Sequence, residues 1–338
     1  MNDPTRLRWG ILGAARVNER LLPAIVEADN AELVAIASRR PGAAAETLAK
    51  YAPERREVRV YDGLEALLDD ERVQAVYLPL ANREHAEWTL RAIARGKHVL
   101  CEKPLALTVA DIDAIRAAAD RHRVLVMEGF MYRFHPQHGR ALDLVRSGAI
   151  GELRSVRASF SFLLRPARSY RVAESVERGG GALWDIGCYA IHSIRMFFDQ
   201  PPARVTAMLH WAANGADLSG SGVLDFGQGR FAQFDFSFER ARRSEYEVIG
   251  TAGGLKCHTV WQLPGDIPVL SWWTEDGCSH EERLPPANHF RREVEHFSAC
   301  VLHGKAPALS LADARDNCRT LLAVLRSAAE GRAVALTD

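Results

Sequence analysis

The chain has 338 residues, and its 43 Lys and Arg balance 43 Asp and Glu to give a formal net charge of zero. A neutral balance offers no broad basic footprint of the kind that binds nucleic acid or an acidic membrane. Hydrophobic residues reach 47%, which supports packed cores and excludes a globally disordered chain. The length is typical of about two domains.

Cysteine usage and the lack of long apolar runs bear on the compartment. None of the six cysteines stands in a CxxC pair, and a chain of this length does not need disulfides for stability. No apolar run approaches the roughly 18 residues of a membrane span, and the first residues lack a signal-type pattern. We therefore expect a reduced, cytoplasmic protein.

Strand and helix signals alternate over residues 1–125. The predicted strands are 7–12, 33–37, 76–78, 99–101 and 124–127. The predicted helices are 17–28, 43–51, 83–95 and 108–122. This alternation indicates βαβ units around a parallel sheet in a first domain.

Strands dominate after residue 125. The predicted strands are 153–162, 205–211, 222–226, 233–238 and 245–249, and the predicted helices are 137–146, 183–198, 290–302 and 311–329. Phe234, Phe236 and Phe238 alternate with polar residues, a period of two that marks a strand buried on one face. We predict a second domain, 126–338, with a mostly antiparallel sheet, helices on one face and some late segments packing on the first domain.

The turn after the first strand is a candidate cofactor loop. In the fingerprint GxGxxG the three glycine positions are here Gly13, Ala15 and Asn18, which is a weak match. The location is better support, because a helix that follows a strand and a tight turn offers free N–H groups to a pyrophosphate. An ordinary strand-to-helix turn is the alternative.

The second strand ends at Ser38-Arg39-Arg40. An NAD-selective site normally places an acidic residue here to bind the ribose 2′-hydroxyl. A hydroxyl and two guanidinium groups suit a 2′-phosphate instead, so NADP(H) is preferred and NAD(H) remains possible. Two solvated surface arginines are the alternative.

Lys103 follows the fourth predicted strand and precedes Pro104. Ligands of open α/β sheets bind beyond the carboxyl ends of strands, and proline restricts the preceding residue to extended geometry. An ammonium held there can hydrogen-bond a substrate oxygen and lower a neighbouring pKa. A solvated strand-end lysine is the alternative.

Three glycines, 179–181, precede a predicted helix that carries Asp185, Tyr189 and His192. In an α-helix these three side chains share one face, and a phenol near an ammonium suits a general base. Tyr189 as a core residue is an open alternative, and for His192 a packed histidine is favoured. No third ligand at a standard spacing accompanies Asp185 and His192, so we expect no metal.

Several motifs occur together in one order along the chain. They are Gly13-x-Ala15, Ala37-Ser38-Arg39, the segment 77–88, Cys101-Glu102-Lys103-Pro104-Leu105, the segment 128–136 and the segment 179–189. With these motifs the sequence resembles the Gfo/Idh/MocA oxidoreductase family over nearly its whole length. It is most similar to the branch of glucose–fructose oxidoreductase, NADP-dependent D-xylose dehydrogenase and dimeric dihydrodiol dehydrogenase.

The resemblance implies an α/β Rossmann domain with a parallel doubly wound sheet, then an α+β domain with a large, mostly antiparallel sheet. It implies a catalytic Lys103, Tyr189 as acid/base and Asp185 as the carboxylate that orients substrate. The residues implied to contact the cofactor are Gly13, Ala14, Ala15, Arg16, Val17, Ser38, Arg39, Arg40, Leu80, Asn82, His85, Glu102 and Lys103. Those implied to bind substrate are Lys103, Arg133, Asp185 and Tyr189, with the segment 288–290 at the border of the cleft.

The implied reaction is hydride transfer between nicotinamide and a sugar or polyol carbon that bears a hydroxyl or carbonyl. Oxidation of a trans-dihydrodiol and a non-catalytic NADP-sensing regulator are the alternatives. The resemblance also implies a homodimer. Asn18, Ala81 and Gly129 depart from the residues usual in the family at their positions, and none of them replaces a reacting group.

Overall fold

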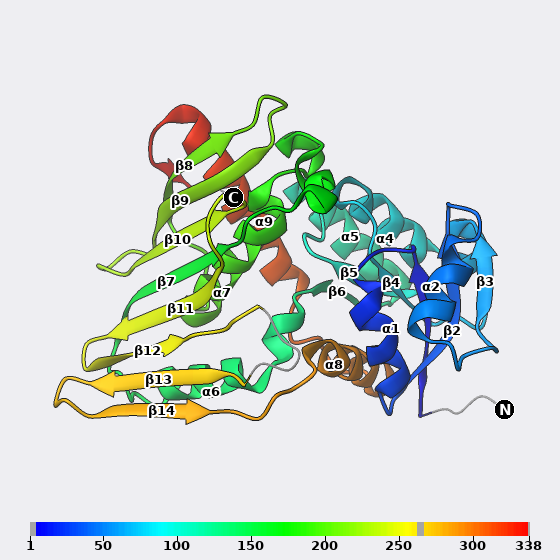
Figure 1. Cartoon of the computed structure of the whole chain (residues 1–338), viewed down its shortest axis with the longest axis horizontal. Coiled ribbons are helices and arrows are strands. Elements are labelled where there is room, and N and C mark those ends of the chain that lie inside the picture. Colours follow the sequence, from blue (N-terminus) through cyan, green and yellow to red (C-terminus); the bar gives the residue numbers. More distant parts are fainter. Residues whose placement is uncertain (1–4, 262–266, 337–338) are drawn as a thin grey trace. The chain divides into compact units, whose positions relative to one another are not determined.

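The computed structural model describes residues 5–261 and 267–336, which fold into two compact units (Figure 1). Unit 1 comprises the chain up to Phe134 together with Asn288–Arg315. Unit 2 comprises His135–Ala287 and the chain from Asp316 onward. A late segment thus returns to the first unit.

Unit 1 is built on a six-stranded sheet in the order β3-β2-β1-β4-β5-β6, with every described pair parallel. The strands are β1 Leu7–Leu12, β2 Ala31–Ser38, β3 Arg59–Asp62, β4 Ala75–Leu78, β5 His98–Glu102 and β6 Val126–Gly129. The helices are α1 Asn18–Glu27, α2 Ala43–Tyr51, α3 Leu64–Leu68, α4 His85–Ala94, α5 Val109–His122 and α8 His289–His303, with short 3-10 helices η1 Asn82–Glu84 and η2 Met131–Phe134. The predicted doubly wound parallel sheet is confirmed, and its order reverses at β1, which pairs with both β2 and β4.

The central strands of unit 1 form because nearly all their residues are apolar and buried, as expected for parallel strands covered on both faces. The late helix α8 packs on this core. Trp9 of β1 donates its indole N–H to Ser298 Oγ at 3.0 Å, and its ring centroid lies 5.5 Å from that of Phe297. The return of residues 288–315 to unit 1 is therefore secured by buried contacts.

Unit 2 contains a nine-stranded sheet in the order β14-β13-β12-β11-β7-β10-β9-β8-β15. The strands are β7 Leu153–Ser161, β8 Arg204–Trp211, β9 Asp217–Asp225, β10 Phe231–Ser237, β11 Arg243–Gly250, β12 Gly253–Cys257, β13 Val269–Thr274, β14 Ser279–Arg283 and β15 Val334–Ala335. The helical segments are α6 Pro136–Arg146, η3 Pro166–Val172, η4 Val176–Arg178, the π-helical η5 Leu183–Gly187, α7 Cys188–Phe198 and α9 Leu311–Glu330, whose first residues belong to unit 1. Within the described part of this sheet only β7 and β10 pair in parallel, so the predicted mostly antiparallel sheet is confirmed.

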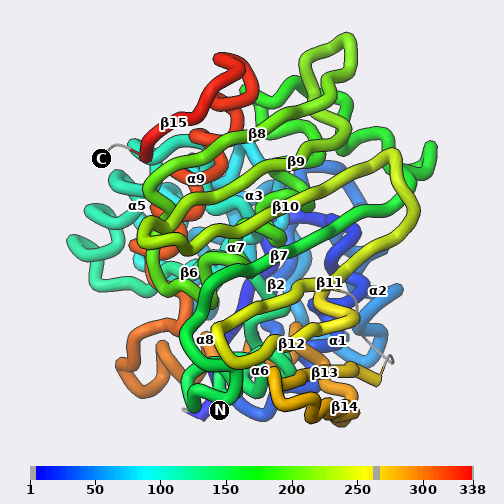
Figure 2. Tube along the Cα trace, turned by 90° about the vertical axis from the view of Figure 1, so that its left-hand side faces the viewer, coloured from blue at the N-terminus to red at the C-terminus, as the bar shows by residue number. Residues whose placement is uncertain are grey.

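The two faces of the unit 2 sheet differ in what they contact. Phe234, Phe236 and Phe238 are at most 3% exposed, and β10 packs against α7, so the phenylalanine stripe is a layer of the core. Figure 2 shows the opposite face, across which the strands lie side by side. Met208 and Phe231 expose 74% and 48% of their surface, and the alternation along their strands places them on that second face.

Candidate active site

The turn after β1 is closed by a buried side chain. Asn18, the first residue of α1, donates from Nδ2 to the carbonyl oxygen of Gly13 at 2.8 Å, and its Oδ1 is buried without a partner among the described residues. Gly13 has φ +139°, and a Cβ added there would lie 3.0 Å from Leu80 Cδ2. Asn18, although a departure from the family pattern, therefore fixes the turn at the helix N-terminus.

The end of β2 lies beside this turn. The Arg40 guanidinium donates to the carbonyl oxygen of Ala14 at 3.2 Å, and Arg40 N donates to Ser38 Oγ at 3.1 Å. Arg39 makes a bidentate ion pair with Glu84. Burial opposes ionisation of Glu84, yet the hydrogen bonds and charge of Arg39 lower the pKa of Glu84 below its usual value. Two guanidinium groups and a hydroxyl thus gather beside the turn, and no acidic residue ends β2, a donor set that fits a 2′-phosphate.

Lys103 leaves the sheet at the end of β5. The preceding Glu102 accepts the Tyr77 hydroxyl from β4 and the Lys103 backbone N–H at 3.3 Å. The Lys103–Pro104 peptide bond is cis, and Pro104 is buried while Lys103 is half-buried. The contacts of Glu102 therefore fix the backbone from which the Lys103 side chain projects.

His85 connects the loop after β4 to the exit of β5. Its Nδ1 lies 2.7 Å from the Pro104 carbonyl oxygen, and its Nε2 lies 3.0 Å from the Leu80 carbonyl oxygen. A neutral ring donates to only one of these carbonyls. Burial lowers the pKa of His85, although both carbonyl oxygens oppose that shift. Ala81, at φ −71° and ψ 145°, keeps a backbone conformation that proline also adopts.

Two buried acids in unit 1, Glu128 and Glu293, were not among the predicted site residues. Glu128 of β6 accepts the Leu105 N–H at 2.9 Å, which holds the chain just beyond Pro104. Burial raises the pKa of Glu293 on α8 well above its ordinary value, and the nearby charge of Glu102 adds to the shift. Nothing local in the sequence distinguishes the buried Glu293 from Glu295, which lies two residues on and is only half-buried.

In unit 2, Asp185 and Tyr189 lie on the predicted helix, but its first turn is not α-helical. Leu183–Gly187 forms a π-helical turn that carries Asp185, and α7 follows with Tyr189. The expectation of a regular i, i+4, i+7 face is therefore wrong at its start, because a π turn contains an extra residue. His192 is 1% exposed, as the packed-histidine interpretation expected.

Asp185 has an ionic partner that sequence reasoning missed. The Arg171 guanidinium, from η3, donates to Asp185 Oδ2. Burial works against the charge on Arg171, but Asp185 outweighs it and the pKa of Arg171 is raised. Arg171 and Asp185 are 22% and 19% exposed, so the pair remains accessible to a polar ligand.

An aromatic cluster surrounds Tyr189. Its ring centroid lies 5.8 Å from Phe160 and 6.3 Å from Trp261. Phe160 and Trp261 stack on each other at 4.6 Å. Tyr189 is 7% exposed and its two ring neighbours are buried as well, so its ring packs among apolar rings as the core-residue alternative expects.

The remaining substrate candidates lie in unit 1. Arg133 is a partly exposed residue of η2. Asn288 caps α8 by accepting the Arg291 N–H at 3.2 Å, and His289 and Phe290 are buried. Gly129 ends β6 opposite Glu102. The segment 288–290 therefore has a clear structural role at the start of a helix.

The parallel sheet brings the predicted cofactor residues together. Residues 13–17 follow β1, 38–40 end and follow β2, 80–85 follow β4, and 102–103 end and follow β5. These four strands are neighbours in the order β2-β1-β4-β5, and the carboxyl ends of parallel strands share one edge. Unit 1 thus gathers a turn, two arginines, His85 and Lys103 at one edge, while unit 2 gathers Asp185, Tyr189 and Arg171.

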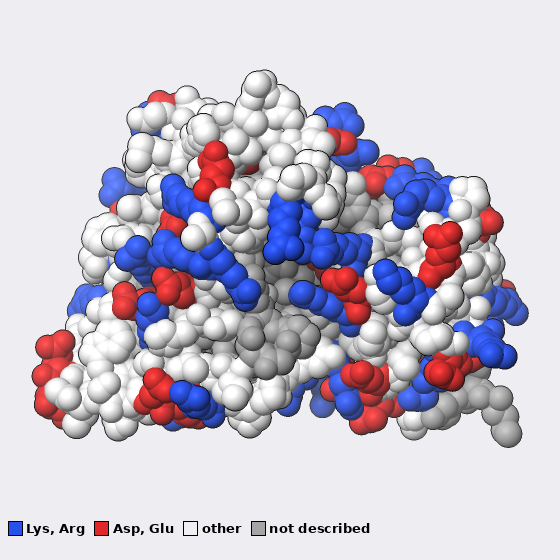
Figure 3. Space-filling view, viewed as in Figure 1, with Lys and Arg blue, Asp and Glu red and all other residues white. Residues whose placement is uncertain are grey.

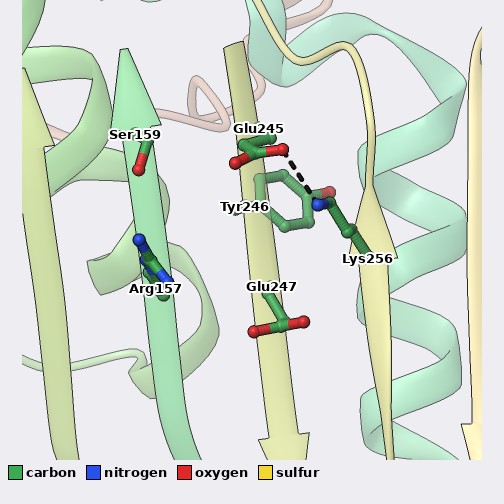
Figure 4. A pocket seen from close by; sticks show the side chains of 6 residues that line it. All are labelled: Arg157, Ser159, Glu245, Tyr246, Glu247 and Lys256. Atoms are coloured by element: carbon green, nitrogen blue, oxygen red, sulfur yellow. Dashed lines mark ion pairs between the residues drawn. The ribbon is translucent and has the colours of Figure 1, made fainter. Parts of the chain in front are cut away.

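A charged hollow of about 100 Å³ lies on the open face of the unit 2 sheet, away from Tyr189. Figure 4 shows its lining, in which Lys256 of β12 pairs with Glu245 of β11 at 3.0 Å. Arg157 and Glu247 complete the mixture of charges. On the face shown in Figure 3, acidic and basic side chains are likewise mixed on both units.

Two negative findings apply to residues 5–261 and 267–336. No group of three or more His, Cys, Asp or Glu residues there is arranged to hold a metal ion. No helix in these ranges is long and apolar enough to cross a membrane. None of the six cysteines, which all lie in these ranges, forms a disulfide, and five of them are buried.

Comparison with known proteins identifies the family. Residues 7–130 match the model of an oxidoreductase family with an NAD-binding Rossmann fold, and residues 138–256 match the GFO/IDH/MocA C-terminal domain. The chain belongs to the Gfo/Idh/MocA oxidoreductase family. The match covers both units, so the resemblance seen in the sequence is confirmed.

Individual members of the Gfo/Idh/MocA family cover the chain nearly end to end. D-xylose 1-dehydrogenase (NADP⁺) 2 of Haloferax volcanii is 34% identical over 98% of this chain and 100% of its own. Trans-1,2-dihydrobenzene-1,2-diol dehydrogenase of Xenopus tropicalis is 29% identical, covering 90% of this chain and 93% of its own. A 3-ketoreductase of Actinomadura kijaniata, solved with NADP and TDP-benzene, matches with a TM-score of 0.87 and 34% identity, covering 95% of this chain and 98% of its own.

Proposed function

We propose that this Gfo/Idh/MocA protein is an NADP(H)-dependent oxidoreductase that transfers a hydride between nicotinamide and a sugar or polyol carbon. The observation that carries the proposal is the shared sheet edge, because the turn after β1, the arginines after β2 and Lys103 after β5 all follow the carboxyl ends of parallel strands of one sheet. Similarity to the D-xylose dehydrogenase and the 3-ketoreductase, which use or bind NADP, supports the same function.

The cofactor fits the residues at that edge. The turn at Gly13 and the start of α1 would hold the pyrophosphate, and Asn18 fixes this turn by donating from Nδ2 to the carbonyl oxygen of Gly13. Ser38, Arg39 and Arg40 would hold a 2′-phosphate, although Arg39 must share its charge with Glu84. A bound nicotinamide supplies or accepts the hydride, and side chains of the protein donate or accept the protons.

The reacting groups have distinct tasks in this proposal. In oxidation, the phenolate of Tyr189 takes the proton of the substrate hydroxyl as general base. Lys103 hydrogen-bonds the same oxygen and favours the ionised phenol through its positive charge. Asp185, held by Arg171, accepts a second substrate hydroxyl and fixes the orientation. An aldose would yield a lactone, and reduction of a keto-sugar reverses the steps.

The test is to replace Lys103 with Met and Tyr189 with Phe in separate proteins. Each change should lower kcat by at least about a hundredfold, the usual contribution of general acid–base catalysis, while NADPH binding measured by fluorescence persists. Lys256→Met on the sheet face and Tyr51→Phe, whose residue ends α2 and is half-buried, are matched controls. Turnover near that of the unaltered enzyme in both Lys103→Met and Tyr189→Phe would refute the assignment.

Trans-dihydrodiol oxidation is a second candidate because the rings of Phe160 and Trp261 surround Tyr189. These buried rings give the Tyr189 phenol apolar surroundings, which suit a carbocyclic diol better than a polyol. A higher kcat/KM for a dihydrodiol than for every sugar tested would select this alternative. NADPH binding without turnover of any tested sugar, keto-sugar or diol would instead select a non-catalytic sensor.

We also propose a homodimer formed through the open face of the unit 2 sheet, which exposes Met208 and Phe231. Light scattering should then give twice the chain mass of 37.5 kDa, and a single chain mass at micromolar concentration would refute the dimer. Six cysteines that form no disulfide favour a cytoplasmic location.

A further inference from the structure

Asp217, at the start of β9, is a buried carboxyl that none of the roles above includes. Its side chain is 0% exposed, and its Oδ2 accepts the backbone N–H of Leu183 at 2.7 Å. Leu183 begins the π-helical turn that leads into α7, and the preceding Ala182 makes no side-chain cap. The first N–H groups of a helix lack partners within it, so Asp217 supplies from a distant strand the acceptor missing locally.

Gly181 makes room for this contact. It has φ +100°, and a Cβ added there would overlap Oδ1 of Asp217. Gly215 also has a positive φ, +80°, but a Cβ there would meet only Ser175 Cβ, at 3.4 Å. The glycine at 181 is therefore needed both for its backbone angle and for the close approach of the carboxyl group.

The surroundings of Asp217 make its ionisation sensitive to pH near neutrality. Burial raises the pKa of Asp217 to about 7, the N–H groups of Leu183 and Ala182 oppose that shift, and the charge of Asp185 adds to it. The charged groups on the helix side are Asp185 and its partner Arg171. On the sheet side, His210 and Glu239 pair with each other, and Glu239 also accepts the Ser219 hydroxyl.

We propose that Asp217 is a positioning residue, whose carboxylate anchors the first turn of the helix that carries Asp185 and Tyr189 and thereby orients both side chains toward substrate. The inference rests on the proposed function, which assigns substrate contact to those two residues. A hydrogen bond to a carboxylate is roughly twice as strong as one to a neutral acceptor, so protonation of Asp217 loosens the anchor.

Fold stability alone does not account for a carboxylate at this position. Its Oδ1 is buried without a hydrogen-bond partner among the described residues, and a buried charge is costly. Because folding raises the pKa of Asp217, its stabilising effect is full below the ordinary aspartate range and is lost as pH rises toward 7. The anchor strengthens over the same interval, so stability and activity should change in opposite directions.

The first experiment compares Asp217→Asn with Asp225→Asn, whose residue lies on the same strand and pairs with Arg204 at the surface. Asparagine keeps the acceptor for Leu183 but stays neutral. With NADP and the best substrate, Asp217→Asn should lower kcat about fivefold to tenfold at pH 8. Its kcat should approach that of the unaltered enzyme near pH 6, and Asp225→Asn should follow the unaltered profile.

The second experiment compares Gly181→Ala with Gly215→Ala, because both add a Cβ at positive φ and only the first displaces Asp217. Gly181→Ala should reproduce the kcat profile of Asp217→Asn, whereas Gly215→Ala should lower only the thermal midpoint. Amide hydrogen exchange at residues 182–189 should accelerate in Asp217→Asn and Gly181→Ala at pH 8. Exchange in β7 should not change.

Each of three results would overturn the proposal. The first is that Asp217→Asn keeps the kcat and pH profile of the unaltered enzyme, and the second is that its loss of kcat is no larger than its loss of folded protein. The third is that Gly215→Ala lowers kcat as much as Gly181→Ala does. If the unaltered enzyme turns over no substrate, the proposed function fails. Hydrogen exchange then still tests whether Asp217 anchors the first turn of the helix. Unchanged exchange at 182–189 in Asp217→Asn would then refute it.

Discussion

Unit 1 and unit 2 hold their predicted reacting side chains in different ways. Lys103 is placed by residues adjacent to it in sequence or on neighbouring strands, chiefly Glu102 and Tyr77. Asp185 and Tyr189 lie at the start of a helix whose contacts come from distant segments, through Arg171 and Asp217. A strand end in a parallel sheet is thus fixed by the sheet, whereas this helix start needs partners of its own.

The difference has a consequence for substitutions. In unit 2, a change at a residue that meets no substrate should still lower turnover, because it releases the helix start. In unit 1, changes around the sheet edge should act mainly on cofactor binding or on stability, because the strands keep the backbone of Lys103 in place. The following experiments sharpen or break this contrast.

The largest effect is expected for Arg171→Met. The change leaves Asp185, which is 19% exposed, without its ionic partner, and loss of a partly buried charge partner costs about 2–3 kcal/mol. The kcat/KM for substrate should fall roughly 30-fold to 150-fold, while the Kd for NADPH is unchanged. Arg178→Met, which removes the surface pair with Glu174, is the control. Equal losses in both variants would break the contrast.

A smaller effect is expected for Arg39→Ala at the edge of unit 1. Loss of one exposed guanidinium should raise the KM for NADPH about tenfold, an effect of about 1.4 kcal/mol. The KM for NADH should change little, because NADH has no 2′-phosphate. Arg116→Ala, whose residue pairs with Asp113 on α5, should change neither constant. A parallel rise for both cofactors would contradict the assigned 2′-phosphate site.

The smallest effect is expected for Glu293→Gln. Folding raises the pKa of this carboxyl, so its stabilising effect is present below the ordinary glutamate range and is lost as pH rises toward the folded pKa. The thermal midpoint of Glu293→Gln relative to the unaltered protein should therefore increase with pH. The surface variant Glu295→Gln should show no such trend, and a constant difference across pH for Glu293→Gln would refute the buried-acid interpretation.

The contrast between local and distant contacts also explains which elements of the fold could be predicted from the sequence. The strand 7–12 and the helix 43–51 have the predicted bounds, because buried parallel strands and amphipathic helices carry strong periodic signals. The strands β3, β12, β13, β14 and β15 were not predicted. β3 and β14 are largely exposed, and β12, β13 and β15 are short, so pairing with neighbouring strands rather than local pattern determines them.

The candidate site divides in the same way. The placement of Lys103 and of Ser38-Arg39-Arg40 at one sheet edge followed from strand ends alone. Arg171 and Asp217 meet the helix start across 14 and 34 residues, and no local spacing encodes such contacts. The π turn at Leu183–Gly187 was missed because an apolar pattern does not distinguish it from an α turn.

The most direct test of the account is a cofactor-coupled activity screen of the unaltered enzyme beside Tyr189→Phe. The panel contains aldoses, keto-sugars, inososes and dihydrodiols, each assayed with NADP(H) and NAD(H). The account predicts turnover of at least one sugar or polyol, a higher kcat/KM with NADP(H), and a loss of at least about a hundredfold in Tyr189→Phe. Sugar turnover that is equal in the two proteins would contradict it.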